Sequence, residues 1–189
     1  MKPVSTNEIT SIADYELERP TLRPRMMDLK DRRRVRVGDH LTFLFENRET
    51  VRYQIQEMMR IERLVKPEEI RHEVETYNEL IPETNGLAAS LLIEYETPEL
   101  RDVWLRKLLG LENHVWIEAG SAGRAKARFD DRQIATDRIS SVQYIQFALS
   151  AEQAAAFPRG AKVVVDHPEY QAETALTEAQ LAELASDLA

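Results

Sequence analysis

The 189-residue chain contains no cysteine. This absence excludes disulfides, thiolate catalysis and thiolate ligands for an iron–sulfur cluster or a structural zinc. Any metal site must therefore use histidine, carboxylate or carbonyl ligands, with iron, manganese or zinc as the metals that such ligands suit. Long apolar runs are also missing, and the N-terminal MKPVSTNEITSIADY lacks the apolar segment of a signal peptide. We therefore expect a cytoplasmic protein without membrane insertion.

The easily recognised catalytic motifs are absent as well. The sequence has no HExxH, no glycine-rich phosphate loop and no GxSxG, and no histidine and acid are placed so as to suggest a triad. These absences exclude the readily identified metalloproteases, P-loop proteins, dinucleotide enzymes and hydrolases. Whether the protein is an enzyme is left open by its sequence.

Charge is plentiful but unevenly distributed. The net charge is −8, yet residues 1–36 hold nine Lys and Arg against six Asp and Glu, so the rest of the chain is strongly acidic. An acidic body repels phosphate backbones, and we expect no nucleic-acid binding. A basic run can either dock an acidic partner or anionic ligand, or close a helix whose carbonyl end favours cations. This run comprises Lys30, Arg32, Arg33, Arg34 and Arg36.

The composition predicts a folded chain with a single domain over residues 1–189, since 43% of residues are hydrophobic and 31% are charged. The expected class is α+β, with N-terminal helical segments and a helical hairpin packed on a mixed, mainly antiparallel β-sheet. Three regions follow from the patterns: a helical lead-in over 1–39, a helical hairpin region over 40–85 and an α+β sheet region over 86–189.

The lead-in and hairpin are predicted from caps and periodicity. Pro20 suits the first position of a helix that runs through Leu29, and Asn47 caps a helix after the strand-like HLTFLFEN. Over residues 48–65 the apolar side chains recur at helical spacing, and Pro67 begins a second helix. The first helix has the apolar positions Val51, Ile55, Met58, Met59 and Val65, and the second has Ile70, Val74, Tyr77 and Ile81.

Beyond Gly86 the pattern is that of strands joined by short turns and helices. Helices are expected in TPELRDVWLRKLLGL, in SAEQAAAF and over residues 177–188. Strands are expected in LAASLLIEYE, NHVWIEAG, RAKARFD, SVQYIQFAL, AKVVVDH and YQAETAL.

Glu62 is the most unusual residue of the hairpin, because the helical periodicity places it inside the apolar arc. A carboxylate in a dry interface must be paired, protonated or bound to a metal. Pairing with Arg48, Arg34, Gln54 or Tyr77 is the structural alternative. The functional alternative is a metal site that Glu62 forms with Glu73, His40 and Glu46.

Seven strings resemble an uncharacterised bacterial family, a domain of unknown function often encoded near rubrerythrin and cysteine-rich iron–sulfur oxidoreductases. They cover nearly the whole chain and are HLTFLFENRETV, YQIQEMMRIER, HEVETYNELIP, GLENHVW, ARFD, RISSVQYIQF and VVVDHPEYQAE. The family has no established activity, so the resemblance implies context: oxidative-stress defence or electron transfer beside rubrerythrin-like or iron–sulfur partners. We expect some polar members to line a pocket where the hairpin meets the sheet, among them Arg48, Gln54, Tyr77 and Asn78.

Three hypotheses follow. The first is an accessory α+β protein that binds a partner from the rubrerythrin and iron–sulfur system through the basic run or the hairpin. The second is a metal-binding protein or metal-dependent enzyme with the ligands named above. The third is a small-molecule or anion binder that uses Arg48 with the basic run.

His114, which strand alternation places beside Trp116, is a further candidate for a binding site. The sequence leaves open whether the protein forms a homo-oligomer.

Overall fold

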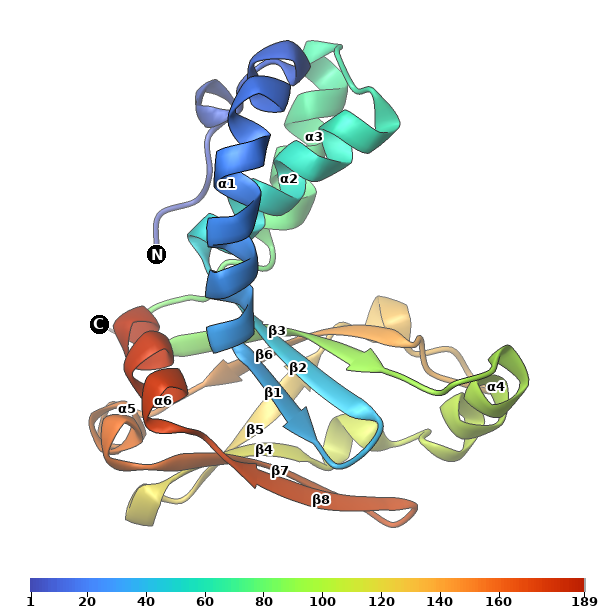
Figure 1. Ribbon diagram of the computed structural model, residues 1–189. Coiled ribbons are helices and arrows are strands. Elements are labelled where there is room, and N and C mark those ends of the chain that lie inside the picture. The colour runs from blue at the N-terminus through green and yellow to red at the C-terminus, as the bar shows by residue number, and fades with distance from the viewer. Residues whose placement is uncertain (189) are drawn as a thin grey trace.

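The computed structural model describes residues 1–188 and shows one eight-stranded sheet with a helical unit standing on its outer face (Figure 1). The strand order is β1-β2-β3-β6-β5-β4-β7-β8, and every pairing is antiparallel. The predicted α+β class is confirmed, whereas the mixed sheet is wrong because these strands form no parallel pair. The strands are β1 (Arg34–Val37), β2 (Leu41–Glu46), β3 (Gly86–Ile93), β4 (Val115–Ala119), β5 (Arg124–Phe129), β6 (Val142–Ala148), β7 (Ala161–His167) and β8 (Tyr170–Ala175).

Three of the α-helices form the helical unit, and three lie at the ends of the sheet (Figure 1). The helical unit consists of α1 (Ile12–Arg32), α2 (Arg48–Glu62) and α3 (Pro67–Asn78). At one end of the sheet lies α4 (Pro98–Lys107), and at the other lie α5 (Ala151–Ala156) and α6 (Glu178–Ala185). No helix within residues 1–188 is long and apolar enough to cross a membrane.

The helix α1 is longer than the sequence predicts. It begins at Ile12, after the cap residue Ser11, so Pro20 and Pro24 lie inside it rather than at its start. Each proline removes one backbone hydrogen bond. Packing offsets this cost, because the helix buries an apolar stripe against α2 that consists of Tyr15, Met26 and Leu29.

The helical hairpin forms as predicted, but α2 is shorter than its periodicity suggests. The Asn47 side chain accepts hydrogen bonds from the backbone N–H groups of Glu49 and Thr50, both at 3.0 Å, and so caps the helix. The helix ends at Glu62, where Arg63 adopts a left-handed conformation with φ of 56°. The prediction of helix to residue 65 is therefore wrong, and Val65 is 70% exposed.

The strands β1 and β2 lie in the expected lead-in and hairpin regions, yet they belong to the same sheet as the later strands. Alternation along β2 places Leu41, Phe43 and Phe45 in the core, each at most 1% exposed. The other face of β2 carries Leu44, which aligns with Ser90 on β3 and with Tyr144 on β6. This outer row of side chains is the surface above which the helical unit stands.

The sheet curls until β1 and β8 approach each other, and side chains rather than a backbone ladder bridge the seam. Each bridge brings a donor to a carbonyl oxygen of β1 at 2.7 Å: Tyr170 to Val37, Thr174 to Arg36, and Gln180 to Arg34. These contacts satisfy acceptors that an open sheet edge would leave to solvent.

Gly38 permits this closure. Its φ is +66°, and a Cβ atom at this position would lie 2.3 Å from the Tyr170 hydroxyl oxygen. Only glycine combines this backbone conformation with so close an approach.

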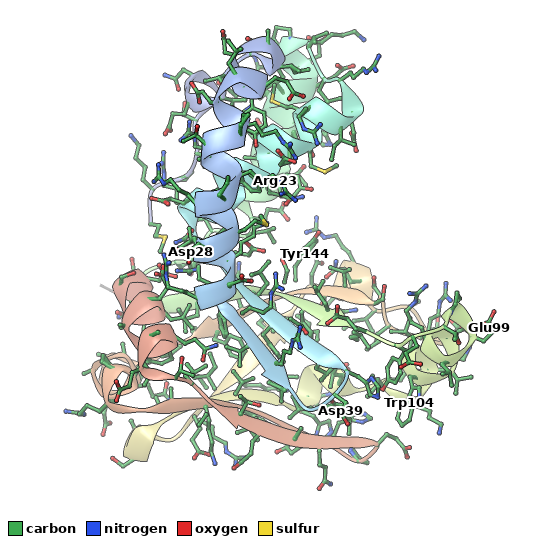
Figure 2. The ribbon with its side chains drawn as sticks, viewed as in Figure 1. Arg23, Asp28, Asp39, Glu99, Trp104 and Tyr144 are labelled. Carbon is green, nitrogen blue, oxygen red and sulfur yellow. The ribbon has the colours of Figure 1, made fainter. Side chains whose placement is uncertain are left out.

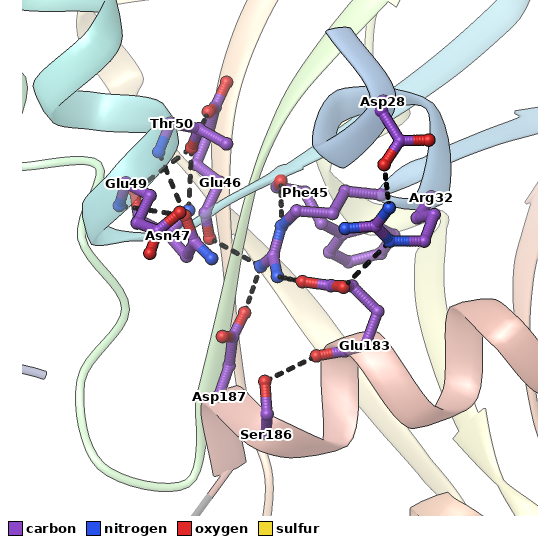
Figure 3. A network of polar contacts seen from close by, with 11 residues as sticks. Asp28, Arg32, Phe45, Glu46, Asn47, Glu49, Thr50, Glu183, Ser186 and Asp187 are labelled. Carbon is purple, nitrogen blue, oxygen red and sulfur yellow. Dashed lines mark hydrogen bonds and ion pairs between the residues drawn. The ribbon is translucent and has the colours of Figure 1, made fainter. Parts of the chain in front are cut away.

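Arg33 is fully buried and joins three elements. Figure 3 labels its partners Phe45, Glu46, Glu183 and Asp187. Its guanidinium donates to the backbone oxygens of Phe45, at 2.9 Å, and Glu46, at 3.2 Å, at the end of β2. It also forms ion pairs with Glu183 in α6, at 3.1 Å, and with Asp187 just beyond that helix. The neighbouring Arg32 pairs with Asp28 and Glu183, and Arg34 pairs with Asp31. Three members of the basic run are thus engaged within the chain.

A second polar network joins α1 to α2. Glu57 accepts hydrogen bonds from the Tyr15 hydroxyl at 2.6 Å and from the Arg19 guanidinium at 2.7 Å. Burial alone would raise the pKa of the Glu57 carboxyl, but these donors, aided by the charge of Arg60, lower it to about 2. Its side chain is only 13% exposed, so the carboxylate stabilises the helical unit while it is ionised.

Replacing Arg33 with Met should destabilise the protein by about 3–5 kcal/mol, because Asp187 would stay buried without its partner. The Arg32→Met variant is the control and should cost far less, since Arg32 pairs with the same Glu183 but its side chain is 42% exposed. Urea unfolding at neutral pH measures both changes. Equal losses in the two variants would contradict the role assigned to Arg33.

The pKa of Glu57 predicts a pH-dependent contribution to stability. Because the folded pKa of about 2 lies below the ordinary value of 4.5, the contribution is complete above pH 5 and disappears as the pH falls toward 2. Relative to wild type, Glu57→Gln should lose up to about 3 kcal/mol at pH 7 and progressively less in acid. Urea unfolding at several pH values tests this. Glu16→Gln is the matched control, since that side chain is 50% exposed, and a pH-independent gap for Glu57→Gln would refute the assignment.

Candidate functional site

An open cleft of about 760 Å³ lies where the helical unit meets the sheet. One wall consists of the last turns of α3 and the segment 79–83 that follows it. The other wall consists of the outer face of β6 and the end of β5 with the short helical turn Asp131–Gln133. Cavities of roughly 300–1,000 Å³ are typical of ligand sites. The location agrees with the pocket predicted between the hairpin and the sheet.

Two half-buried tyrosines face the cleft, Tyr77 from α3 and Tyr144 from β6. Figure 2 shows Tyr144 on the sheet surface below the helical unit. Burial raises the pKa of both phenols; the amide of Gln54 opposes the shift at Tyr77, and the carboxylate of Glu46 adds to it at Tyr144. Both side chains therefore stay neutral near pH 7, where they offer an aromatic face and a hydroxyl group to a bound molecule.

Charged side chains of both signs surround the tyrosines. On α3, Glu73 is half-buried, and burial together with the charge of Glu62 raises the pKa of its carboxyl. On the opposite wall Arg132 pairs with Glu79 at 2.6 Å and with Asp130 at 2.8 Å, so that it spans the cleft. The pair of Arg132 and Glu79 is exposed, with side chains 72% and 56% accessible, and such pairs are worth little.

The floor of the cleft is fixed by amide contacts. Gln146 on β6 donates to the backbone oxygen of Glu79 at 3.0 Å and accepts a hydrogen bond from Arg128 on β5. Within residues 1–188, no carboxylate lies within 4.0 Å of the Arg128 guanidinium. Across these described residues, the cleft lining therefore includes two phenols and a guanidinium without a carboxylate partner.

Glu46 lies next to the cleft and has a structural role in the chain. Its two carboxylate oxygens accept hydrogen bonds from the Thr50 hydroxyl at 2.6 Å and from the Ser90 hydroxyl at 2.8 Å. These bonds hold the first turn of α2 on β3, and the positive end of the helix favours the negative charge. Both carboxylate oxygens are thus engaged.

The structure does not bring the four predicted metal ligands together. Glu62 is exposed because α2 ends at this residue, so its predicted burial in the apolar arc is wrong. Among the other three predicted ligands, Glu73 lies close enough for the charge of Glu62 to raise the pKa of its carboxyl. His40 lies beyond the other end of β2 from Glu46 and stacks on Tyr95 with ring centroids 4.1 Å apart. Within residues 1–188, no group of three or more His, Asp and Glu side chains is arranged to hold a metal ion.

The predicted pocket residues are divided between the cleft and other sites. Tyr77 and Asn78 line the cleft, and Gln54 lies beside Tyr77. Asn78 is also structural, because its amide exchanges hydrogen bonds of 2.8 and 2.9 Å with the backbone of Val4. Arg48 instead pairs with Glu8 of the N-terminal segment.

His114 belongs to a different part of the sheet. It lies before β4, where its ring nitrogen is 3.1 Å from an oxygen of Asp166, and the Trp116 indole donates to the same oxygen at 3.1 Å. The ring of His114 meets that of the buried His167 edge-on at 5.2 Å. This cluster shares no residue with the cleft.

The cleft residues that were not predicted from the sequence include Arg128, Arg132, Tyr144 and Gln146. The alternation within SVQYIQFAL places Tyr144 and Gln146 on the face opposite Ile145 and Phe147, so the outward direction was readable. The alternation does not predict which strands pair with this segment. Only the order β3-β6-β5 places this face below α3.

The comparison with known proteins leaves the activity open. No curated protein matches the sequence. Among solved structures, the chain is similar to a crystal structure of a novel protein of unknown function from Burkholderia pseudomallei, with 29% identity, a TM-score of 0.93 and coverage of 100% of both chains.

The sequence also matches the family described as "Protein of unknown function (DUF3501)" over residues 3–188. This match confirms the resemblance to an uncharacterised family, while an association with rubrerythrin stays a prediction. The chain therefore belongs to the DUF3501 family of proteins of unknown function.

Proposed function

We propose that this protein is a non-catalytic accessory protein that binds a partner protein in the cleft between α3 and β6. The observation that carries the proposal is the open 760 Å³ cleft, in which Tyr77 and Tyr144 project from two different parts of the fold. Tyrosine and arginine dominate the energetically important contacts of protein interfaces. The cleft combines both residue types with a rim of mixed charge.

The contacts across the cleft are weak, which supports binding of a partner between its two walls. The exposed pair of Arg132 and Glu79 costs little to break, so a partner segment can displace it. The raised pKa values of the two tyrosines keep them protonated, which suits hydrogen bonding and does not suit proton abstraction near neutral pH.

The identity of the partner rests on the resemblance noted in the sequence. It implies a rubrerythrin-like or iron–sulfur protein and a cytoplasmic role in oxidative-stress defence or electron transfer. Without cysteine, this chain supplies no thiolate for a cluster of its own, so the redox centre would belong to the partner.

Co-purification at low salt tests this proposal. We expect a rubrerythrin-like or iron–sulfur protein of the same organism to be retained by the wild-type protein. Tyr144→Arg should weaken retention at least about tenfold, because it removes an aromatic contact and adds a positive charge to the cleft. Gln171→Arg, on the exposed face of β8, is the matched control and should bind as wild type does. No association of the wild-type protein, or equal retention by Tyr144→Arg, would count against the proposal.

A metal site at Glu62 and Glu73 is the second candidate, because these carboxylates lie close enough for one charge to raise the pKa of the other carboxyl. A bound cation would relieve this repulsion. Metal analysis of protein purified without a histidine tag tests the candidate. Substoichiometric metal that Glu62→Ala leaves unchanged would exclude it.

In the absence of metal, the raised pKa of Glu73 makes a separate prediction. A raised folded pKa means that ionisation costs stability as the pH rises above 4.5, so Glu73→Gln should stabilise the protein at pH 7. The gain should vanish near pH 4. Thermal unfolding measures it, with the exposed Glu75→Gln on the same helix as control. A metal at this site would reverse the result, since added Mn²⁺ or Zn²⁺ would then stabilise only the wild type.

A further inference from the structure

The helix α4 lies at one end of the sheet, away from α3 (Figure 1), and it carries exposed apolar side chains. Leu100 is 48% exposed and Val103 is 49% exposed. They lie three residues apart and therefore on one face of the helix. The opposite side of the same segment buries Leu105 and Leu108 in the core, so this outer face is free to meet another molecule.

The exposed face is held in a fixed position. On one flank of α4, Asp102 accepts hydrogen bonds from Arg106 at 3.1 Å and from Arg138 at 2.7 Å. On the other side, the ring of Trp104 stacks on the buried Tyr95 with centroids 5.3 Å apart. A rigid surface loses little conformational entropy on association.

The charges along this face are ordered. Glu99, Val103 and Lys107 follow one another at four-residue spacing, so the face carries an acid in the first turn, an apolar centre and a base in the last turn. Figure 2 shows Glu99 on the side of α4 turned away from the sheet. Neither Glu99 nor Lys107 belongs to an ion pair within residues 1–188. Lys107 does lie 4.7 Å from the centre of the Trp104 ring.

We infer that α4 is a self-association surface on which two copies of the chain pair as antiparallel helices about a two-fold axis at Val103. This arrangement places Glu99 against Lys107 of the partner subunit, and the symmetry repeats the contact. Leu100 and Val103 then pack between the two ion pairs. A two-fold interface requires a surface that complements itself, and the order of acid, apolar centre and base meets this requirement only for antiparallel helices.

The contact is small, so the dimer is weak. A helix of ten residues is about 15 Å long and buries far less than the roughly 1,200 Å² of a stable interface. We therefore expect a reversible dimer with a Kd of roughly 0.1–1 mM that dissociates further as salt screens the ion pairs. This inference is independent of the cleft, and Tyr144→Arg should leave it unchanged.

Sedimentation velocity over a concentration series from about 10 µM to 1 mM tests the inference on the full chain. Val103→Glu should raise the Kd at least tenfold. Leu17→Glu is the control, since Leu17 is an 81% exposed apolar residue on α1 and its replacement should change nothing. Circular dichroism and the Tm check that both variants fold.

A charge exchange tests the antiparallel register. Glu99→Lys and Lys107→Glu should each weaken the dimer several-fold, and the double variant should restore it to within about threefold of wild type. A wild-type protein that stays monomeric to 1 mM would overturn the inference. So would a dimer that Val103→Glu leaves intact, or a double variant that fails to recover.

Discussion

The buried guanidinium of Arg33 is the interaction on which the arrangement of this fold depends. Arg33 lies between the end of α1 and the start of β1. Its guanidinium donates hydrogen bonds to the backbone carbonyl oxygens at the end of β2 and pairs with the carboxylates of Glu183 and Asp187. The segment 183–187 is thereby tied to β1 and β2. Loss of any one partner would leave a buried charge unpaired, which is strongly destabilising. The helical unit, the sheet and α6 must therefore come together in one geometry.

The cleft follows from this arrangement. The Arg33 network and the hydroxyl groups around Glu46 fix the start of α2 on the sheet, and the network around Glu57 holds α1 against α2. The far wall, formed by α3, is attached to β5 and β6 mainly through Gln146 and the exposed pair of Arg132 and Glu79. The helices α1 and α2 are therefore held firmly on the sheet, whereas α3 and the sheet are separated by the open cleft that Tyr77 and Tyr144 line.

Local patterns predicted most of the secondary structure but not the environment of single polar residues. The cap at Asn47, the start of α3 at Pro67 and the strands after Gly86 are present, because each depends on a few neighbouring residues. Glu62 shows the limit of this reasoning. Its position on the helical wheel was read from a helix that continued to residue 65, but α2 ends at Glu62, and the Glu62 side chain is exposed. The predicted helix start at Pro20 was wrong for a different reason. Packing stabilises one continuous α1 through Pro20, where local preference would begin a new helix.

The sequence by itself determined the class of the protein: a cysteine-free, acidic α+β chain with a helical hairpin. These properties depend on composition and on periods of two to four residues. Tertiary structure alone decided the strand order, the closure of the sheet by Tyr170 and the meeting of Tyr77 with Tyr144, which are 67 positions apart in the chain. It also decided that Arg33 is buried while Arg32 is not. Such outcomes depend on which distant segments pack together, and packing is set by the whole core rather than by local preference.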